Sequence, residues 1–259
     1  MKFNSLEIWL NKKCNLSCDY CEFKSNEKDA KISEKIYDQL KNNKFTEVKI
    51  LGGEPLIYDH FKELIETIHK YHKSDIILYT NIKDISKVKS MVGDFRKISI
   101  IASYHPIDNP NHLKSFIKNG LFLKKIVKNF KVHYMLTNLP IKTHISNIKK
   151  LIKIFELEVH LLYSDLKILS SKDLYNDSFF KNLLRDTIND WDKVDPFSKK
   201  KCKINQHNII IDNHLDEYCF CTKDVLNKRN LKKSSITLQN EILLCEETCF
   251  DDLEFCIND

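Results

Sequence analysis

The sequence predicts an α/β protein, a partial (β/α)6 barrel followed by a small cysteine-rich C-terminal domain. Strand-like and helix-like segments alternate through the first two-thirds of the 259 residues, as in parallel sheets whose strands are joined by helices. The strand-like segments are apolar, which suits strands that are covered on both faces. The nine cysteines gather in two groups near the ends of the chain. We expect the barrel in residues 1–165, a bridging segment in 166–200 and the cysteine-rich domain in 201–259.

Each predicted element follows from its own local pattern. The strands are short apolar runs, at 5–10, 47–51, 75–80, 97–103, 131–137 and 157–163. The helices repeat apolar residues every three or four positions, at 32–40, 60–69, 85–91, 111–129 and 146–155. A further helix at 179–191 and a hairpin of 209–211 with 215–218 follow. The strand–helix repeats imply six parallel strands joined by right-handed crossovers. The resulting sheet is either an open doubly wound sheet or a partial barrel. Both architectures collect ligands at the carboxyl ends of the strands.

The composition excludes several classes of protein. With 42% hydrophobic and 30% charged residues the chain is neither disordered nor collagen-like. No run of about 18 apolar residues occurs, so we expect no membrane partner. The first ten residues do not form a secretory signal, so we expect a cytoplasmic protein. The net charge is +6, but the lysines are scattered, and we therefore expect no nucleic acid partner.

Three cysteines lie within eight residues, directly after the first predicted strand: Cys14, Cys18 and Cys21. A loop this short wraps its sulfurs around one compact metal centre. Three thiolates are one too few for a four-sulfur zinc site or an ordinary iron–sulfur cluster. No histidine is near in sequence, since the first one is His60. The pattern indicates a [4Fe–4S] cluster with one iron open to a ligand; a zinc knuckle or unrelated cysteines are the alternative.

A second motif, Gly52-Gly53-Glu54-Pro55, directly follows the strand that ends at Leu51. The chain has only four glycines, so two adjacent ones indicate a specific need. Glycine lets the backbone approach a ligand closely or adopt a positive φ. Glu54 adds a carboxylate at the end of this strand.

Together these motifs resemble the radical SAM superfamily. Its CxxxCxxC signature stands here as Cys14, Cys18 and Cys21, with the aromatic Tyr20 before the last cysteine, and the segment 52–55 is similar to the family's GGEP motif. The resemblance covers roughly residues 5–165. It implies that the open iron binds S-adenosylmethionine (SAM), whose methionine amino group meets the GGEP segment. Reductive cleavage of SAM then yields a 5′-deoxyadenosyl radical that abstracts a hydrogen atom from a substrate.

The same resemblance directs attention to the ends of the other strands. Candidate SAM-contacting residues are Thr80, Asn81, Ser103 and Asn138. Ordinary capping of strand ends is the alternative reading of these residues. Tyr104 and His105 follow Ser103 and are candidates for substrate contact and catalysis. His105 is a candidate proton acceptor, because the unperturbed pKa of histidine is near neutrality.

The C-terminal cysteines resemble the SPASM and twitch extensions of radical SAM proteins. Six cysteines lie here: Cys202, Cys219, Cys221, Cys245, Cys249 and Cys256. The first two keep the spacing of these extensions, although His214 takes the place of their glycine, and the full SPASM cysteine run is absent. The shorter twitch form implies one auxiliary [4Fe–4S] cluster. We expect its ligands to be Cys202, Cys219, Cys245 and Cys249, with Cys221 and Cys256 as possible substitutes.

Two local expectations accompany this ligand set. The predicted hairpin brings Cys202 and Cys219 near each other, and a helix puts Cys245 and Cys249 on one face. A structural zinc site is the alternative to the auxiliary cluster.

The fold does not select the substrate. We favour a small polar metabolite, such as a sugar derivative, that undergoes dehydrogenation or epimerisation, and a ribosomal peptide is the second candidate. The resemblance implies a low-potential electron donor, normally flavodoxin or ferredoxin. Both are acidic, which is compatible with the basic chain. A zinc-stapled nucleic-acid-binding protein is the alternative from another functional class.

Overall fold

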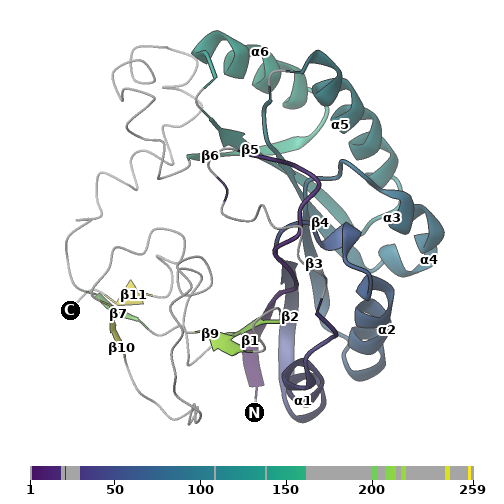
Figure 1. The fold of residues 1–259 in the computed structure, drawn as a ribbon, viewed down its shortest axis with the longest axis vertical. Helices are drawn as coiled ribbons and strands as arrows, with labels where there is room; N and C mark the ends of the chain where they lie inside the picture. The colour runs from purple at the N-terminus through teal and green to yellow at the C-terminus, as the bar shows by residue number, and fades with distance from the viewer. Residues whose placement is uncertain are drawn as a thin grey trace.

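The computed structural model describes a curved, open parallel sheet with helices on one side (Figure 1). The described residues are 2–18, 21, 30–107, 109–137, 139–161, 200–202, 208–213, 217–219, 243–245 and 256–257. The first six strands are β1 (Lys2–Trp9), β2 (Lys44–Leu51), β3 (Asp75–Thr80), β4 (Ile98–Tyr104), β5 (Asn129–Leu136) and β6 (Glu156–Leu161). They pair in sequence order, and each adjacent pair is parallel. The predicted partial (β/α)6 fold is confirmed.

The helices in the described part of the chain connect these strands. They are α1 (Glu34–Asn42), the 3-10 helix η1 (Pro55–Ile57), α2 (Phe61–Tyr71), α3 (Ser86–Ser90), α4 (Val92–Phe95), α5 (Pro110–Leu123) and α6 (Ile141–Leu151). Their start signals are readable in sequence: the Ser33 hydroxyl caps α1, and the Asn109 side chain caps α5 just before Pro110. None of the helices among the described residues has the length and apolar character that a bilayer crossing requires.

The two faces of the sheet differ in burial. Along β4 and β5, fully buried side chains alternate with half-buried ones, because successive residues of a strand point to opposite faces. The buried set, which includes Ile100, Val132 and Tyr134, packs in the main hydrophobic cluster with residues of the helices. The other set lies on the concave side of the sheet, opposite the helices of the described residues (Figure 1).

Two helix boundaries differ from the prediction by five residues or more. The α5 helix ends at Leu123 rather than at residue 129, because the following turn pairs Lys128 N–H with Ile98 O and starts β5. Gly120 does not break this helix. A Cβ there would lie 2.8 Å from the Phe155 ring, so glycine lets that ring pack closely. The α6 helix begins five residues before the predicted position, directly after Pro140.

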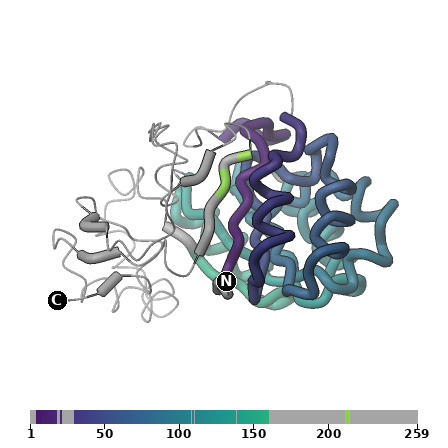
Figure 2. Tube along the Cα trace, turned by 90° about the horizontal axis from the view of Figure 1, so that it is seen from below, coloured from purple at the N-terminus to yellow at the C-terminus, as the bar shows by residue number. Residues whose placement is uncertain are grey.

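The sheet continues beyond β1 into the C-terminal part of the chain. Strand β8 (Asn208–Asp212) pairs with β1 in parallel, and β9 (Glu217–Cys219) pairs with β8 antiparallel, which gives the order β6-β5-β4-β3-β2-β1-β8-β9. Figure 2 shows the green part of β8 beside the purple first strand. The β8–β9 hairpin was predicted, but its pairing with β1 was not. Strand β1 is therefore an interior strand.

Three short strands make a second sheet in the order β10-β7-β11, from β7 (Lys200–Cys202), β10 (Leu243–Cys245) and β11 (Cys256–Ile257). Cys202 lies opposite Cys256 in its register. Cys245 ends a strand, so the expectation that it lies on a helix is wrong. The predicted helix at 179–191 and the bridging segment 166–200, except Lys200, fall outside the described residues. The domain boundaries stay a prediction.

Candidate active site at the carboxyl ends of the strands

The loop that leaves β1 carries the three early cysteines. Cys18 is buried, whereas Cys14 and Cys21 are half-buried. A turn joins Cys21 N–H to Cys18 O at 3.1 Å, and the Leu16 N–H donates to Cys14 Sγ at 3.4 Å. The loop follows the carboxyl end of a parallel strand, which is where the sequence placed it.

The electrostatics of this loop suit a positively charged centre. Burial raises the pKa of Cys14 to about 11; the Leu16 N–H opposes this, and negative charge on Glu54, Cys21 and Cys18 adds to the rise. A bound metal centre reverses that balance, because coordination deprotonates thiols. Among the described residues, no three His, Cys, Asp or Glu side chains are grouped as one metal ion requires. Thiols that coordination deprotonates are the ligands that iron–sulfur clusters use, so the chemistry of this loop suits such a cluster.

The Gly-Gly-Glu turn lies directly against the entrance of the cysteine loop. Leu10 N–H donates to Leu51 O at 2.9 Å, Gly53 N–H to Asn11 O at 2.7 Å, and Glu54 N–H to the carbonyl of the residue before Cys14 at 2.9 Å. A Cβ on Gly53 would lie 2.2 Å from that same carbonyl oxygen. Gly52 has a φ of +134°, which side chains rarely allow. The close approach and the positive φ explain the two adjacent glycines.

Glu54 is a buried carboxylate with three hydrogen-bond donors around it. Its Oε1 accepts from the Thr80 hydroxyl at 2.6 Å and from Leu56 N–H at 2.9 Å, and its Oε2 accepts from Asn81 N–H at 2.7 Å. Burial raises the pKa of Glu54 to about 7, although all three donors lower it. An ionised carboxylate has about four acceptor positions. The described contacts use three of them and leave one for a further donor, such as an ammonium group.

Asn81 connects the carboxylate to the cysteine loop. Its backbone donates to Glu54, and its side-chain Nδ2 donates to Asn15 Oδ1 at 2.8 Å and lies 3.7 Å from Cys14 Sγ. Lys83 reinforces the link, because its Nζ donates to Asn15 O at 2.6 Å. The structure thus brings together four of the predicted elements: the first cysteine, the glycine turn, Thr80 and Asn81.

The residues at the end of β4 point in different directions. Tyr104 is 2% exposed; its ring stacks on His112 at 5.2 Å and meets Phe116 edge-on at 4.8 Å. Its predicted contact with substrate is therefore wrong, because the side chain lies in the helix-side core. Burial raises the pKa of Tyr104 to about 12. Burial and neighbouring His112 lower the pKa of His105 to about 4, so its imidazole is neutral at pH 7.

A row of polar residues on the concave face was not identified from the sequence. Ser103 lies opposite His133 in the β4–β5 pairing, and His133 lies opposite Glu158 in the β5–β6 pairing. His133 Nε2 is 3.0 Å and Lys131 Nζ is 2.8 Å from Glu158 Oε2. Polar residues at alternate positions of a strand were the available signal, since β5 reads lysine, apolar, histidine. Ser103 is the predicted member of this row.

Four of the predicted site residues are not among the described residues: Tyr20, Asn138, Cys221 and Cys249. Cys202 and Cys256 are in the small sheet with Cys245, whereas Cys219 ends β9 of the large sheet opposite Ile210. The expected proximity of Cys202 and Cys219 remains a prediction.

Two known proteins are similar to this chain in sequence. The putative peptide biosynthesis protein YydG of Bacillus subtilis (strain 168) is 31% identical over 129 residues, which cover 45% of this chain and 40% of that protein. The 7-carboxy-7-deazaguanine synthase of Clostridium acetobutylicum is 24% identical over 202 residues, 76% of this chain and 83% of that protein. The chain thus spans less than half of the first relative.

Solved structures show the same fold. Streptococcus suis SuiB bound to S-adenosylmethionine has a TM-score of 0.59 at 18% identity, covering 90% of this chain and 60% of that one. SuiB bound to its precursor peptide SuiA has a TM-score of 0.54 at 20% identity, covering 82% and 58%. The family model of the Radical SAM superfamily matches residues 10–156. This range includes the cysteine loop, the Gly-Gly-Glu turn, strands β2 to β5 and the first residue of β6. The chain belongs to the Radical SAM superfamily.

Proposed function

We propose that this protein cleaves SAM reductively and uses the resulting 5′-deoxyadenosyl radical to remove a hydrogen atom from a peptide. The observation that carries the proposal is the connection from Cys14 through Asn81 to Glu54. It joins a thiol of the signature to the carboxylate of the glycine turn at the carboxyl ends of the strands. The family implies a [4Fe–4S] cluster and SAM. When bound, the cluster supplies the electron that breaks a C–S bond of the sulfonium.

The chain's own residues bind and orient the cluster and SAM. Cys14, Cys18 and Cys21 hold three irons of the cluster. Glu54 accepts the methionine ammonium on its remaining acceptor position, and its other contacts keep the carboxylate from rotating. Gly53 lets backbone lie against backbone where a side chain would separate the two segments. Ser103 lies on the concave face and contacts the ribose or carboxylate of SAM.

A peptide is the favoured substrate. By itself the sequence favoured a small metabolite, with dehydrogenation or epimerisation as the reaction. Two findings now favour a peptide: the relative of highest identity reported above is named for peptide biosynthesis, and SuiB has been solved with its precursor peptide. A small metabolite stays the second candidate, because the deazaguanine synthase matches a larger share of this chain.

Apart from Ser103, the polar row on the concave face supplies substrate contacts. His133 is held by Glu158 at 3.0 Å, which fixes the orientation of its ring. A substrate that loses a hydrogen atom and then an electron also releases a proton. His105 is a poor acceptor, because its pKa is lowered to about 4. We therefore move the proton-accepting role from His105 to His133.

The C-terminal cysteines form the second part of the proposal. An auxiliary [4Fe–4S] cluster of the twitch type would use Cys202, Cys219, Cys245 and Cys249, with Cys221 or Cys256 as substitutes. Held by these cysteines, such a cluster would supply an electron acceptor for oxidation of the substrate. Flavodoxin or ferredoxin would reduce the first cluster. Three of the first four cysteines have described backbones, all in strands.

Anaerobic reconstitution tests these assignments. The wild-type protein should hold about 7–8 iron atoms with two clusters and about four with one. Dithionite-reduced protein should release 5′-deoxyadenosine from SAM, and Cys18→Ala should release none. Bound zinc without iron, or reduced protein that leaves SAM intact, would rule the function out. Precursor-like peptides and small polar metabolites, offered as competing substrates, separate the two substrate classes by which one gains or loses mass.

A further inference from the structure

A buried asparagine of the C-terminal segment lies against both ends of the cysteine loop. Asn213, directly after β8, is 2% exposed. We infer that Asn213 is a positioning residue that closes the cysteine loop of the SAM site. The inference rests on the proposed function, because it assigns the loop a cluster. It makes the C-terminal segment a structural part of the SAM site and not only the carrier of further cysteines.

At the entrance of the loop, Asn213 contacts the last turn of β1. Its backbone N–H donates to Trp9 O at 2.8 Å, which continues the parallel β1–β8 ladder. Its side-chain Nδ2 donates to Leu10 O at 3.3 Å. On the opposite edge of the same chain segment, Leu10 N–H donates to Leu51 O of the Gly-Gly-Glu side. The entrance is thus held from both edges.

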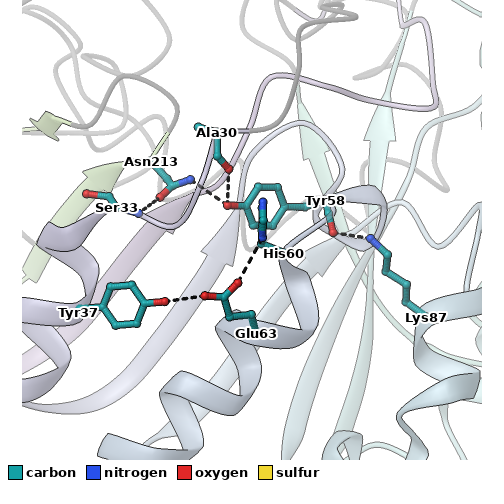
Figure 3. A network of polar contacts seen from close by, with 8 residues as sticks. All are labelled: Ala30, Ser33, Tyr37, Tyr58, His60, Glu63, Lys87 and Asn213. Carbon is teal, nitrogen blue, oxygen red and sulfur yellow. Dashed lines mark hydrogen bonds and ion pairs between the residues drawn. The ribbon is translucent and has the colours of Figure 1, made fainter.

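At the exit of the loop, the same side chain contacts the start of α1. Its Oδ1 accepts from Ser33 N–H at 2.7 Å. Its Nδ2 also donates to the Tyr58 hydroxyl at 3.2 Å, and that hydroxyl donates to Ala30 O at 2.7 Å. Figure 3 shows Asn213 between Ser33 and Tyr58, with Ala30 above the Tyr58 hydroxyl.

One amide group therefore spans residues 10 to 33, the two ends of the segment that holds all three signature cysteines. Its acceptor serves the exit, and its two donor protons serve the entrance and Tyr58. Asparagine suits this position, because its short side chain carries one acceptor and two donor protons in a single plane. Glutamine carries the same groups on a longer side chain. Fixing the backbone on either side of Cys14, Cys18 and Cys21 limits how far these three residues can move. Precise placement of three thiols depends on such support.

The network also explains why a turn-forming residue is buried. The Ser33 N–H, Leu10 O and Tyr58 hydroxyl are part of the protein interior, and unsatisfied buried groups are costly. Removing Asn213 leaves these groups without this partner. The effect should reach the cluster through the chain segment that leads to Cys14. In this segment Leu10 N–H donates to Leu51 O, and the next residue accepts from Gly53 N–H.

Hydrogen–deuterium exchange of metal-free protein tests the closure directly. In Asn213→Ala, peptides that contain Ser33 should exchange about tenfold faster, as expected for one lost hydrogen bond. Tyr58→Phe should have a smaller effect of the same kind, since it removes only the hydroxyl. This second variant keeps the core packing, and so remains informative if the alanine variant fails to fold.

Reconstituted protein tests the link to the SAM site. The Kd for SAM should rise about tenfold in Asn213→Ala, and the EPR spectrum of the reduced, SAM-bound cluster should change. The control is His72→Ala. His72 bonds Leu40 O at 2.7 Å and Ser74 Oγ at 3.2 Å at the opposite end of the strands, so it should lower stability without altering the Kd or the spectrum.

The outcomes separate this inference from the proposed function. If wild-type protein binds no iron, the proposed function fails, and exchange at Ser33 still decides the closure. Unchanged exchange at Ser33 overturns the inference. So does faster exchange with wild-type SAM affinity and EPR spectrum, because Asn213 would then be structural only. An equal change of both SAM readouts in His72→Ala overturns it as well.

Discussion

Replacing Gly53 by alanine tests the most constrained contact of the site. The added Cβ would lie 2.2 Å from the Lys13 carbonyl oxygen and 2.9 Å from the Lys12 carbonyl carbon. Both are backbone atoms, so no side chain can rotate away. The two segments must therefore separate by about 1 Å to reach an ordinary contact distance.

That separation has a cost that can be worked out. The bonds from Gly53 N–H to Asn11 O at 2.7 Å and from Glu54 N–H to Lys13 O at 2.9 Å would both lengthen beyond a useful range. Two lost hydrogen bonds cost about 1–3 kcal/mol, and forcing in a methyl group costs about 1–3 kcal/mol more. We expect Gly53→Ala to lower the free energy of unfolding by about 2–6 kcal/mol, a large share of a typical total.

Urea denaturation of metal-free protein measures this loss, and iron content with SAM affinity reports the site. The matched control is Gly93→Ala, because a Cβ on the exposed Gly93 meets nothing within 4 Å. It should leave stability within about 0.5 kcal/mol of wild type or raise it slightly. A Gly53→Ala protein with the same urea midpoint and SAM affinity as Gly93→Ala would refute the close-approach argument.

Three further predictions follow from the same site. SAM should bind about eightfold more tightly at pH 7.4 than at pH 6.0. Glu54, with a pKa of about 7, becomes ionised over this range, and its carboxylate attracts the methionine ammonium. Calorimetric titrations that give the same Kd at both pH values would contradict this. Thr80→Val removes a hydrogen bond that lowers the Glu54 pKa, so the midpoint of the same pH curve should move upward, and a downward shift would count against the assigned contact. His133→Gln should slow turnover of the peptide substrate about tenfold, while the release of 5′-deoxyadenosine without substrate stays at the wild-type rate. Equal losses in both assays would show that His133 serves the SAM site instead.

The sequence predicted what local patterns encode. Apolar runs located the six barrel strands, and one of them, Asp75–Thr80, has the predicted bounds. The pairing of β8 with β1 was missed, because residues some 200 positions apart leave no local sign of their contact. Asn213 looked like an ordinary turn former for the same reason, and only its distant partners reveal its place in the fold.

The site shows the same division between local and distant information. The cysteines and the glycine turn were found because their spacing is local. Thr80 was expected to contact SAM, whereas its hydroxyl donates to Glu54. His133 and Glu158 were missed, because a strand register brings them together and not a motif. Tyr104 and His105 are adjacent in sequence, but alternation along the chain puts the tyrosine in the helix-side core.

The position of β1 links the fold to the chemistry. In a six-stranded sheet β1 would be an edge strand, with one row of unpaired backbone groups. Pairing with β8 makes it an interior strand and places backbone on both sides of the loop that it feeds. The Gly-Gly-Glu turn bonds one side of that loop, and Asn213 bonds the other. A reaction that directs a free radical to one hydrogen atom requires fixed distances between the reacting groups. We therefore expect the extra strand to support the proposed reaction by limiting the motion of the cysteine loop.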